Sequence, residues 1–350
     1  MTQVGIVRDD RYLLHDMGPH PESPERLKVI YEMLREPEIQ EITVAIPPRP
    51  ATRDEIETVH SPAYVDQVAE TAGKPYVRLD PDTSTCAASY EAAVWAAGGF
   101  LEAVDAVVEG KVDRAFALVR PPGHHAEQNR AMGFCLFNNI AIGARHAQKR
   151  HGLDRILIVD WDLHHGNGTQ HTFYDEKSVL YFSTHQYPYY PGTGSGGEVG
   201  HGEGEGYTVN APLGPGCGDT VYANLFTHIL RPIALVYKPQ LILVSAGFDT
   251  YHRDPLGGMR VTEMGFARLM NVLKDIARST CSGKIVVTLE GGYDLTGQSQ
   301  SVRAVLLEMG HEADWIDQER CREAEKADYD RIEKGIQAIR KVQGKYWECF

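Results

Sequence analysis

Aspartate and histidine residues at alternate positions give the strongest chemical signal in the sequence. Asp160, Asp162 and His164 are separated by single apolar residues. On an extended segment alternate side chains point the same way, so these three polar groups can lie on one side. Two of them with a further carboxylate, Asp249, would form a one-histidine, two-carboxylate metal site with an open position for water. This donor set suits zinc, with iron(II), cobalt or manganese as alternatives.

Two adjacent histidines, His124 and His125, follow a Pro-Pro-Gly segment that fixes where their side chains point. A neutral imidazole beside the metal would take a proton from bound water and return it to a leaving amine. The carboxylate of Asp160 or the amide of Asn167 would orient one ring and set its tautomer. Adjacent histidines in a loop are more often surface residues, so this assignment depends on those neighbours.

A glycine pair precedes a tyrosine at Gly291, Gly292 and Tyr293. The glycines allow the backbone to turn sharply and approach a ligand, and the phenol would donate a hydrogen bond to a developing oxyanion. Alternatively, Tyr293 is a packing residue beside a glycine turn. This motif alone does not decide between the two roles.

Five short apolar runs recur through the middle of the chain and alternate with helix-like stretches such as 89–109 and 221–237. This alternation predicts β-α units around a buried parallel sheet, in an open α/β sandwich. The runs are 115–119, 156–159, 179–182, 241–244 and 284–289. Polar or glycine-rich residues follow each run, and ligands bind beyond the carboxyl ends of parallel strands. We therefore expect one shared site there, which weakens the alternative that Asp160 and Asp162 only cap a helix.

The composition is that of an ordinary globular protein. The 350 residues are 42% apolar and 24% charged, and 35 basic against 48 acidic residues give a net charge of −13. This charge argues against nucleic acid and anionic membranes as partners and favours cationic substrates. No apolar run approaches the length of a membrane span and no signal peptide is recognisable, so we expect a cytoplasmic protein. Without repeats or low-complexity linkers, a single domain is favoured.

Several ordered motifs together resemble the zinc-dependent histone deacetylase family, which includes the bacterial acetylpolyamine amidohydrolases. They extend over about residues 15–310 and read RPPGHH (120–125), GFCLFNN (133–139), DWDLHHGNG (160–168), SAGFD (245–249) and EGGY (290–293). Trp161 and Asn167 resemble the residues of the class II and bacterial branch of this family. Class I members carry an acidic residue at the position of Asn167.

The resemblance implies the arginase-deacetylase-like fold, a three-layer α/β/α arrangement around a mostly parallel eight-stranded sheet. Residues 1–350 would form a single deacetylase domain, with a catalytic core over about 1–310 and a C-terminal helical extension over 311–350. The implied zinc ligands are Asp162, His164 and Asp249. A structural potassium ion would be bound by Asp160, Asp162, His164, Ser183 and Thr184.

The resemblance also implies roles in hydrolysis of an acetylated amine. His125 would be the general base and then the general acid, His124 its electrostatic neighbour, and Tyr293 would polarise the acetyl carbonyl. Asp160 and Asn167 would support the two histidines. The implied substrate channel comprises Gly133 through its carbonyl, Phe134 and Tyr190 as walls, Leu256, and Asp82 at the mouth.

Leu256 bears on the choice of substrate. Polyamine-selective relatives carry an acidic residue at the corresponding position, so leucine favours acetyl-lysine in proteins, peptides or small lysine-like amines, with longer acyl groups left open. An acetylpolyamine amidohydrolase is the alternative, and the net charge of −13 mildly favours it. A silent acyl-lysine reader is a third hypothesis, although a reader needs neither His125 nor Tyr293. A homo-oligomer is compatible with the sequence.

Overall fold

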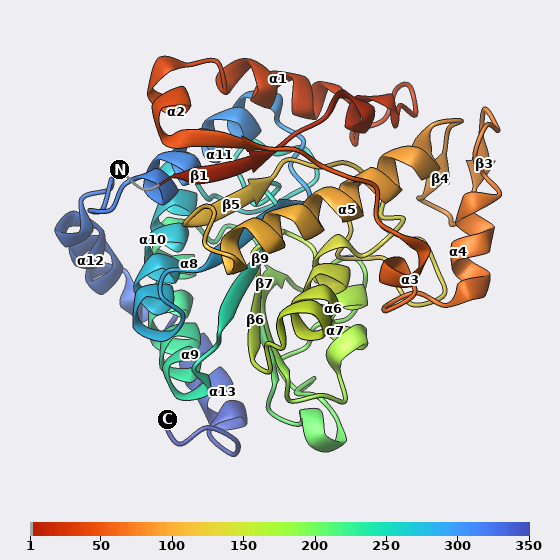
Figure 1. The fold of residues 1–350 in the computed structure, drawn as a ribbon. Helices are drawn as coiled ribbons and strands as arrows, with labels where there is room; N and C mark the ends of the chain where they lie inside the picture. The colour runs from red at the N-terminus through yellow and green to blue at the C-terminus, as the bar shows by residue number, and fades with distance from the viewer. Residues whose placement is uncertain (1–2) are drawn as a thin grey trace.

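The computed structural model describes residues 3–350 and is built around one parallel sheet (Figure 1). Its eight strands lie in the order β2-β1-β5-β10-β9-β6-β7-β8, and every neighbouring pair is parallel. They are β1 (Val4–Val7), β2 (Thr43–Ile46), β5 (Arg114–Ala117), β6 (Ile156–Asp160), β7 (Val179–Gln186), β8 (Thr208–Leu213), β9 (Leu241–Ala246) and β10 (Ile285–Leu289). A separate antiparallel pair consists of β3 (Val77–Arg78) and β4 (Ser84–Thr85).

The five apolar runs found in the sequence are five adjacent strands of this sheet. They correspond to β5, β10, β9, β6 and β7, so the predicted α/β sandwich is confirmed. These strands are almost completely buried, as continuous apolar runs in parallel sheets should be because helices cover both faces. The expected eight-stranded sheet is also confirmed, and the sequence patterns had missed β1, β2 and β8.

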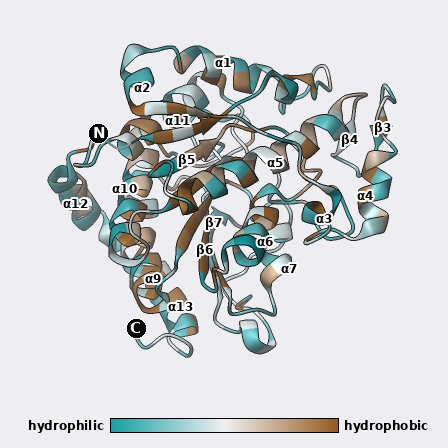
Figure 2. Ribbon diagram, viewed as in Figure 1, coloured by the Kyte–Doolittle hydropathy of each residue, from teal (hydrophilic) through white to brown (hydrophobic). Residues whose placement is uncertain are grey.

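Helices cover the two faces of the sheet and give the molecule three layers (Figure 1). On one face α5 (Ser89–Val108) contacts β1, β5 and β10 and packs against α6 (Asn139–His151). On the other, α10 (Glu263–Thr280) contacts β9 and β10 and packs against α11 (Leu295–Gly310), which contacts α1 (Glu25–Met33). Figure 2 shows hydrophobic strands in the interior and hydrophilic residues on the outer sides of many helices. This distribution places the main core between sheet and helices.

Shorter helices complete the layers and edges. They are α2 (Pro37–Ile42), α3 (Arg53–Ile56), α4 (Pro62–Ala69), α7 (Asn167–Phe173), α8 (Asp219–Leu225), α9 (Arg231–Tyr237), α12 (Gln318–Ala327) and α13 (Glu333–Gln343). The helix expected over 221–237 consists of α8, a π-helical turn at Phe226–Leu230, and α9. Near the chain end, Trp347 is buried and donates a hydrogen bond to the Gly206 carbonyl (2.9 Å). None of the helices in residues 3–350 is long and apolar enough to cross a membrane.

Candidate active site

The loops that follow four adjacent strands meet at the carboxyl end of the sheet. After β5 come His124 and His125, after β6 Asp162 and His164, after β9 Asp249, and after β10 the Gly-Gly-Tyr segment. A pocket opens among these loops. Its lining residues are Asp82, Pro122, His124, His125, Gly133, Phe134, Asp162, His164, Tyr190, Leu256, Gly291 and Tyr293.

Three of the predicted metal ligands form a compact group. Asp162, His164 and Asp249 each offer a ligand atom within 4.8 Å of the others. His164 directs Nδ1 at both carboxylates, 3.2 Å from Asp162 Oδ1 and 3.1 Å from Asp249 Oδ2. Burial would lower the pKa of His164, but the neighbouring carboxylates of Asp162 and Asp249 raise it to about 9. The carboxylates of Asp162 and Asp249 therefore favour a positive charge between them.

One buried oxygen in the group lacks a hydrogen bond. Asp249 Oδ1 accepts from the Leu163 N–H (2.8 Å), whereas Oδ2 accepts none from the described residues. A buried carboxylate oxygen without a donor is costly unless a cation binds it. The nitrogen and oxygen donors of Asp162, His164 and Asp249 thus fit zinc, leaving one coordination position for water.

Two glycines give the carboxylates their space, which the sequence analysis had not recognised. A Cβ at Gly247 would overlap Asp162 Oδ2. A Cβ at Gly291 would lie 2.5 Å from Asp249 Oδ2 and 2.7 Å from Asp162 Oδ2. The Gly291 N–H also donates to Asp162 Oδ2 (2.8 Å) and fixes that oxygen. Both glycines belong to motifs quoted from the sequence, but only the packing explains them.

Hydrogen bonds determine which nitrogen of His125 carries the proton. His125 Nδ1 lies 2.7 Å from Asn167 Oδ1, and the Asn167 amide nitrogen donates to the carboxylate of Glu127. Because that carboxylate requires a donor, the amide oxygen faces His125, which must hold its proton on Nδ1. His125 Nε2 is left with a free lone pair. Glu127 also accepts from His171 Nδ1 (2.9 Å), and neither residue was identified from the sequence.

His125 and His124 differ in their protonation. Burial, together with the nearby His124 and His164, lowers the pKa of His125 well below its ordinary value. Burial also opposes protonation of His124, but the carboxylates of Asp162 and Asp160 outweigh it and raise the pKa to about 10. His124 Nδ1 lies 3.0 Å from Asp160 Oδ2. A neutral ring thus lies beside a cationic one, with ring centroids 4.0 Å apart.

Tyr293 enters the pocket from a segment that is held on two sides. The Asp254 carboxylate accepts from the Tyr293 N–H (2.6 Å), and Arg26 donates from Nε to the Gly292 carbonyl (2.6 Å). The Arg26 guanidinium also lies 5.0 Å from the centroid of the Tyr293 ring. Gly292 has φ of +121°, a conformation that favours glycine. Arg26 and Asp254 lie far from the motif in sequence, so spacing could not reveal their contribution.

The predicted channel residues form the pocket walls. Tyr190 makes an edge contact with the His125 ring, at 5.2 Å between centroids, and Phe134 makes one with Tyr293 at 6.2 Å. A Cβ at Gly133 would overlap the His125 ring, so glycine is required there. Asp82 accepts from the Gly133 N–H (2.9 Å) and thereby holds this wall.

The residues implied for potassium lie next to the zinc-type group. Asp160 pairs in register with Ser183 of β7. Its carboxylate accepts from the Asp162 N–H and the Tyr181 hydroxyl, each at 3.1 Å. Thr184 Oγ1 is buried without a hydrogen bond among the described residues. These oxygen atoms are compatible with an alkali cation, which binds through oxygen.

Comparisons with known proteins agree on one family. A family model described as the histone deacetylase domain matches residues 20–309. The chain is 38% identical to a probable deacetylase of Archaeoglobus fulgidus over 99% of both proteins. It is 42% identical to human polyamine deacetylase HDAC10 over 83% of this chain and 45% of that protein, so it spans about half the length of that relative. The crystal structure of the HDA15 HD domain matches with a TM-score of 0.90 and 39% identity, covering 99% of this chain and 96% of that one.

Proposed function

The chain belongs to the histone deacetylase family and is a hydrolase acting on amides, and from this premise we propose that it is a zinc-dependent lysine deacetylase. One observation carries the proposal most strongly. His125, with Nε2 free to accept a proton, and the phenol of Tyr293 line the same pocket as Asp162 and His164. This arrangement combines a base, an oxyanion donor and a metal site around one small volume.

In the proposed mechanism, zinc held by Asp162, His164 and Asp249 would lower the pKa of a water to about 7 and polarise the acetyl carbonyl. His125 accepts a proton at Nε2 from the water that attacks the amide carbonyl, while Asn167 keeps the other ring proton on Nδ1. Tyr293 donates its hydroxyl proton as a hydrogen bond to the developing oxyanion. His125 then transfers its new proton to the departing amine.

His124 serves a different purpose in this proposal. Its ring stays cationic because it lies between the Asp160 and Asp162 carboxylates. A fixed positive charge beside His125 disfavours the doubly protonated state of that ring, so His125 releases its proton readily to the amine. His124 thus tunes the acid–base residue and does not itself move a proton.

The proposed substrate is an acetylated primary amine on an aliphatic chain. The aromatic side chains of Phe134 and Tyr190 line the pocket and suit the methylene groups of lysine. Leu256 lines the pocket without charge, so it provides no partner for the second ammonium group of a polyamine. The substrate is therefore acetyl-lysine in a protein, peptide or small lysine-like amine, with Asp82 at the channel mouth.

A second candidate is an acetylpolyamine amidohydrolase. It is favoured by the 42% identity to relatives named polyamine deacetylase in human and mouse. The net charge of −13 also attracts polycations. Leucine at position 256 is the observation that places this candidate second.

The test is a comparison of kcat/KM on an acetyl-lysine peptide, acetylputrescine and acetylspermidine. We expect preference for the peptide, and we expect Leu256→Glu to raise the relative rate on acetylspermidine, with Leu256→Gln as the uncharged control. Preference of the unaltered enzyme for polyamines would overturn the substrate assignment. Binding of acylated peptide with no acetate released would instead indicate the reader hypothesis.

Other expectations complete the proposal. Residues 1–350 form one deacetylase domain, and a potassium ion bound at Asp160, Asp162, His164, Ser183 and Thr184 supports the loop that carries the zinc ligands. A cytoplasmic location and homo-oligomer formation stay predictions. They are checked by localisation of the tagged protein and by light scattering.

A further inference from the structure

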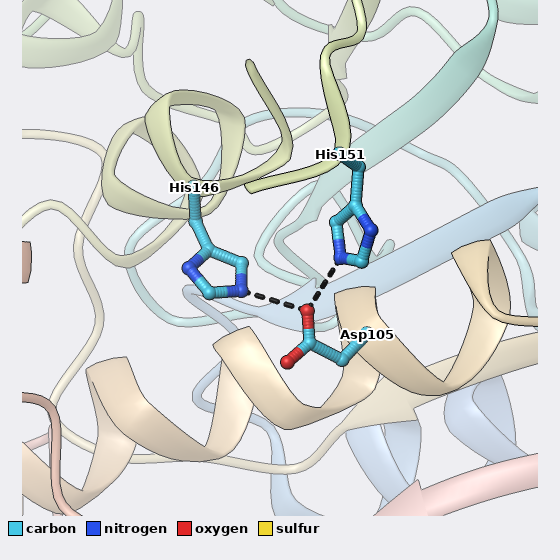
Figure 3. A group of neighbouring side chains, drawn as sticks. All are labelled: Asp105, His146 and His151. Atoms are coloured by element: carbon cyan, nitrogen blue, oxygen red, sulfur yellow. Dashed lines mark hydrogen bonds and ion pairs between the residues drawn. The ribbon is translucent and has the colours of Figure 1, made fainter. Parts of the chain in front are cut away.

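A second cluster of metal-binding residue types lies between α5 and α6 (Figure 3). Asp105 comes from α5, and His146 and His151 come from α6. Their ligand atoms lie within 4.8 Å of one another. Asp105 is in the last turn of α5 and His151 ends α6, so both precede a strand. The cluster therefore lies toward the amino ends of the strands, opposite the pocket, and takes no part in the proposed hydrolysis.

Both histidine rings direct their Nε2 atom at the same oxygen of Asp105. His146 Nε2 lies 2.7 Å and His151 Nε2 2.6 Å from Asp105 Oδ1, as the dashed lines in Figure 3 show. All three side chains are largely buried, with side-chain exposures of 7% for Asp105, 7% for His146 and 12% for His151. Two imidazole nitrogens and one carboxylate oxygen thus converge on one point within the helix interface.

A second carboxylate lies behind the His146 ring. Without a bound cation, His146 donates from Nε2 to Asp105 Oδ1 (2.7 Å). A cation bound at Nε2 would replace that proton and leave the ring protonated on Nδ1, which faces Glu55 Oε1 at 3.8 Å. Carboxylates behind metal-binding histidines support the ring in this way.

The remaining charges leave the convergence point accessible to a cation. Arg150 Nε lies 3.4 Å from the other Asp105 oxygen, Oδ2, and its half-exposed side chain also approaches Glu109. His151 is the last residue of α6 and is followed by Gly152 in the left-handed conformation. A tetrahedral site requires donor separations of about 3.3 Å, a widening of roughly 0.6 Å.

We propose that Asp105, His146 and His151 form a second site for a borderline divalent cation, with zinc as the favoured ion. Two imidazoles and a carboxylate match the preferences of zinc, and a water molecule would fill the fourth position beside the partly exposed His151 ring. Zinc bound there joins α5 to α6 and stabilises one helical layer of the fold. The site is independent of the proposed function.

The test is the metal content of the full chain after chelator treatment, reloading with Zn²⁺ at pH 7.5 and removal of free ion. We expect His151→Gln and Asp105→Asn each to hold one zinc ion fewer per chain than the unaltered protein. His151→Gln is the sharper variant, because the amide of glutamine still donates to Asp105 but binds zinc poorly. Its circular dichroism spectrum and deacetylase rate should be unchanged.

The matched control is His201→Gln, which alters an exposed histidine whose one carboxylate contact within residues 3–350 is with Asp175, at 2.8 Å. This control should keep the full zinc content. His164→Ala should lose a different ion, and the double variant with His151→Gln should lose both. Equal zinc content in the unaltered protein, His151→Gln and Asp105→Asn would overturn the proposal and leave the cluster as a hydrogen-bonded contact between helices.

Discussion

The base assigned to the reaction is defined by a chain of three partners. Asn167 accepts from His125, Glu127 accepts from Asn167, and His171 contacts Glu127 from a half-exposed position. The chain begins in the pocket and ends at the surface. Of these three partners only Asn167 is visible as a motif residue, because Glu127 and His171 are recognisable solely by where the fold places them.

Replacing Glu127 by alanine should slow catalysis without preventing substrate binding. Without the carboxylate, the Asn167 amide is free to turn its nitrogen toward His125, which would hold the ring in the wrong tautomer. We expect kcat to fall about 10–100-fold, the usual effect of losing such a supporting partner, with KM nearly unchanged. Steady-state kinetics over a pH series provides the measurement.

Glu127→Gln is the matched control, since its amide oxygen still accepts from Asn167. This variant should retain most of the activity. A Glu127→Ala enzyme as fast as the unaltered one would show that Asn167 needs no support.

Tyr293→Phe tests the oxyanion donor directly. The substitution removes one hydroxyl from a partly buried ring that lies against Arg26 and Phe134, so the fold should be preserved. We expect kcat to fall about 10²–10³-fold, the typical value for one such donor. Zinc content should stay the same, and an undiminished rate would remove the phenol from the mechanism.

At the level of elements, the strands that build the site were predictable and those at the margins were not. The five central strands are continuous apolar runs, and polar or glycine-rich residues follow each of them directly. β1 and β2 have only four residues each, and β8 contains Asn210 and Pro212. Proline is tolerated at a sheet edge, where β8 lies, but it weakens the sequence signal for a strand.

Loop contacts were beyond prediction for a related reason. Gly133 must be glycine because His125 packs against it, and Arg26 reaches the loop of Gly292 from 266 residues away in sequence. Neither relation has a local pattern. Candidate metal ligands could be recognised by their residue types and their spacing along an extended segment. The residues that support them can be recognised only in the folded structure.

A buried histidine connects the segment between α3 and α4 to the start of α6. His60 Nε2 accepts from the Asn138 N–H and its Nδ1 donates to the Glu127 carbonyl, both at 2.9 Å. Burial lowers the pKa of His60 from 6.5 to about 4. Between these values the unfolded chain binds a proton that the folded protein does not, so stability falls as the pH falls.

The difference between the pKa values of His60 in the unfolded and folded protein sets the size of this effect on stability. His60 alone should reduce the free energy of unfolding by about 2 kcal/mol between pH 7.5 and pH 5. His60→Gln should therefore show a smaller loss over this range than the unaltered protein. Urea unfolding of both proteins at the two pH values measures the difference, and parallel losses would contradict the assignment.

At the level of the whole molecule, the last residues of the chain are part of the packed body. Trp347 contacts Tyr207 and Tyr237, with ring centroids at 5.4 Å and 6.3 Å, and donates to the Gly206 carbonyl. Tyr207 precedes β8, the edge strand. The aromatic chain end therefore packs beside the start of this edge strand.

Trp347→Ala should destabilise the protein by about 3 kcal/mol, through lost burial and a lost hydrogen bond. Trp347→Phe keeps the aromatic packing and should cost only about 1 kcal/mol. Denaturant unfolding with a constant m value measures both. A negligible effect of the alanine variant would mean that the chain end does not contribute to folding.

Gly247 and Gly291 have a consequence for anyone who wishes to redesign this scaffold. In a randomised library, exchange of Asp162 or Asp249 for another metal-binding type leaves room for a new ion. Any side chain at the two glycine positions would instead occupy the space of the carboxylates themselves. Selections for altered metal preference should consequently recover diversity at the proposed ligand positions 162 and 249 and only glycine at 247 and 291.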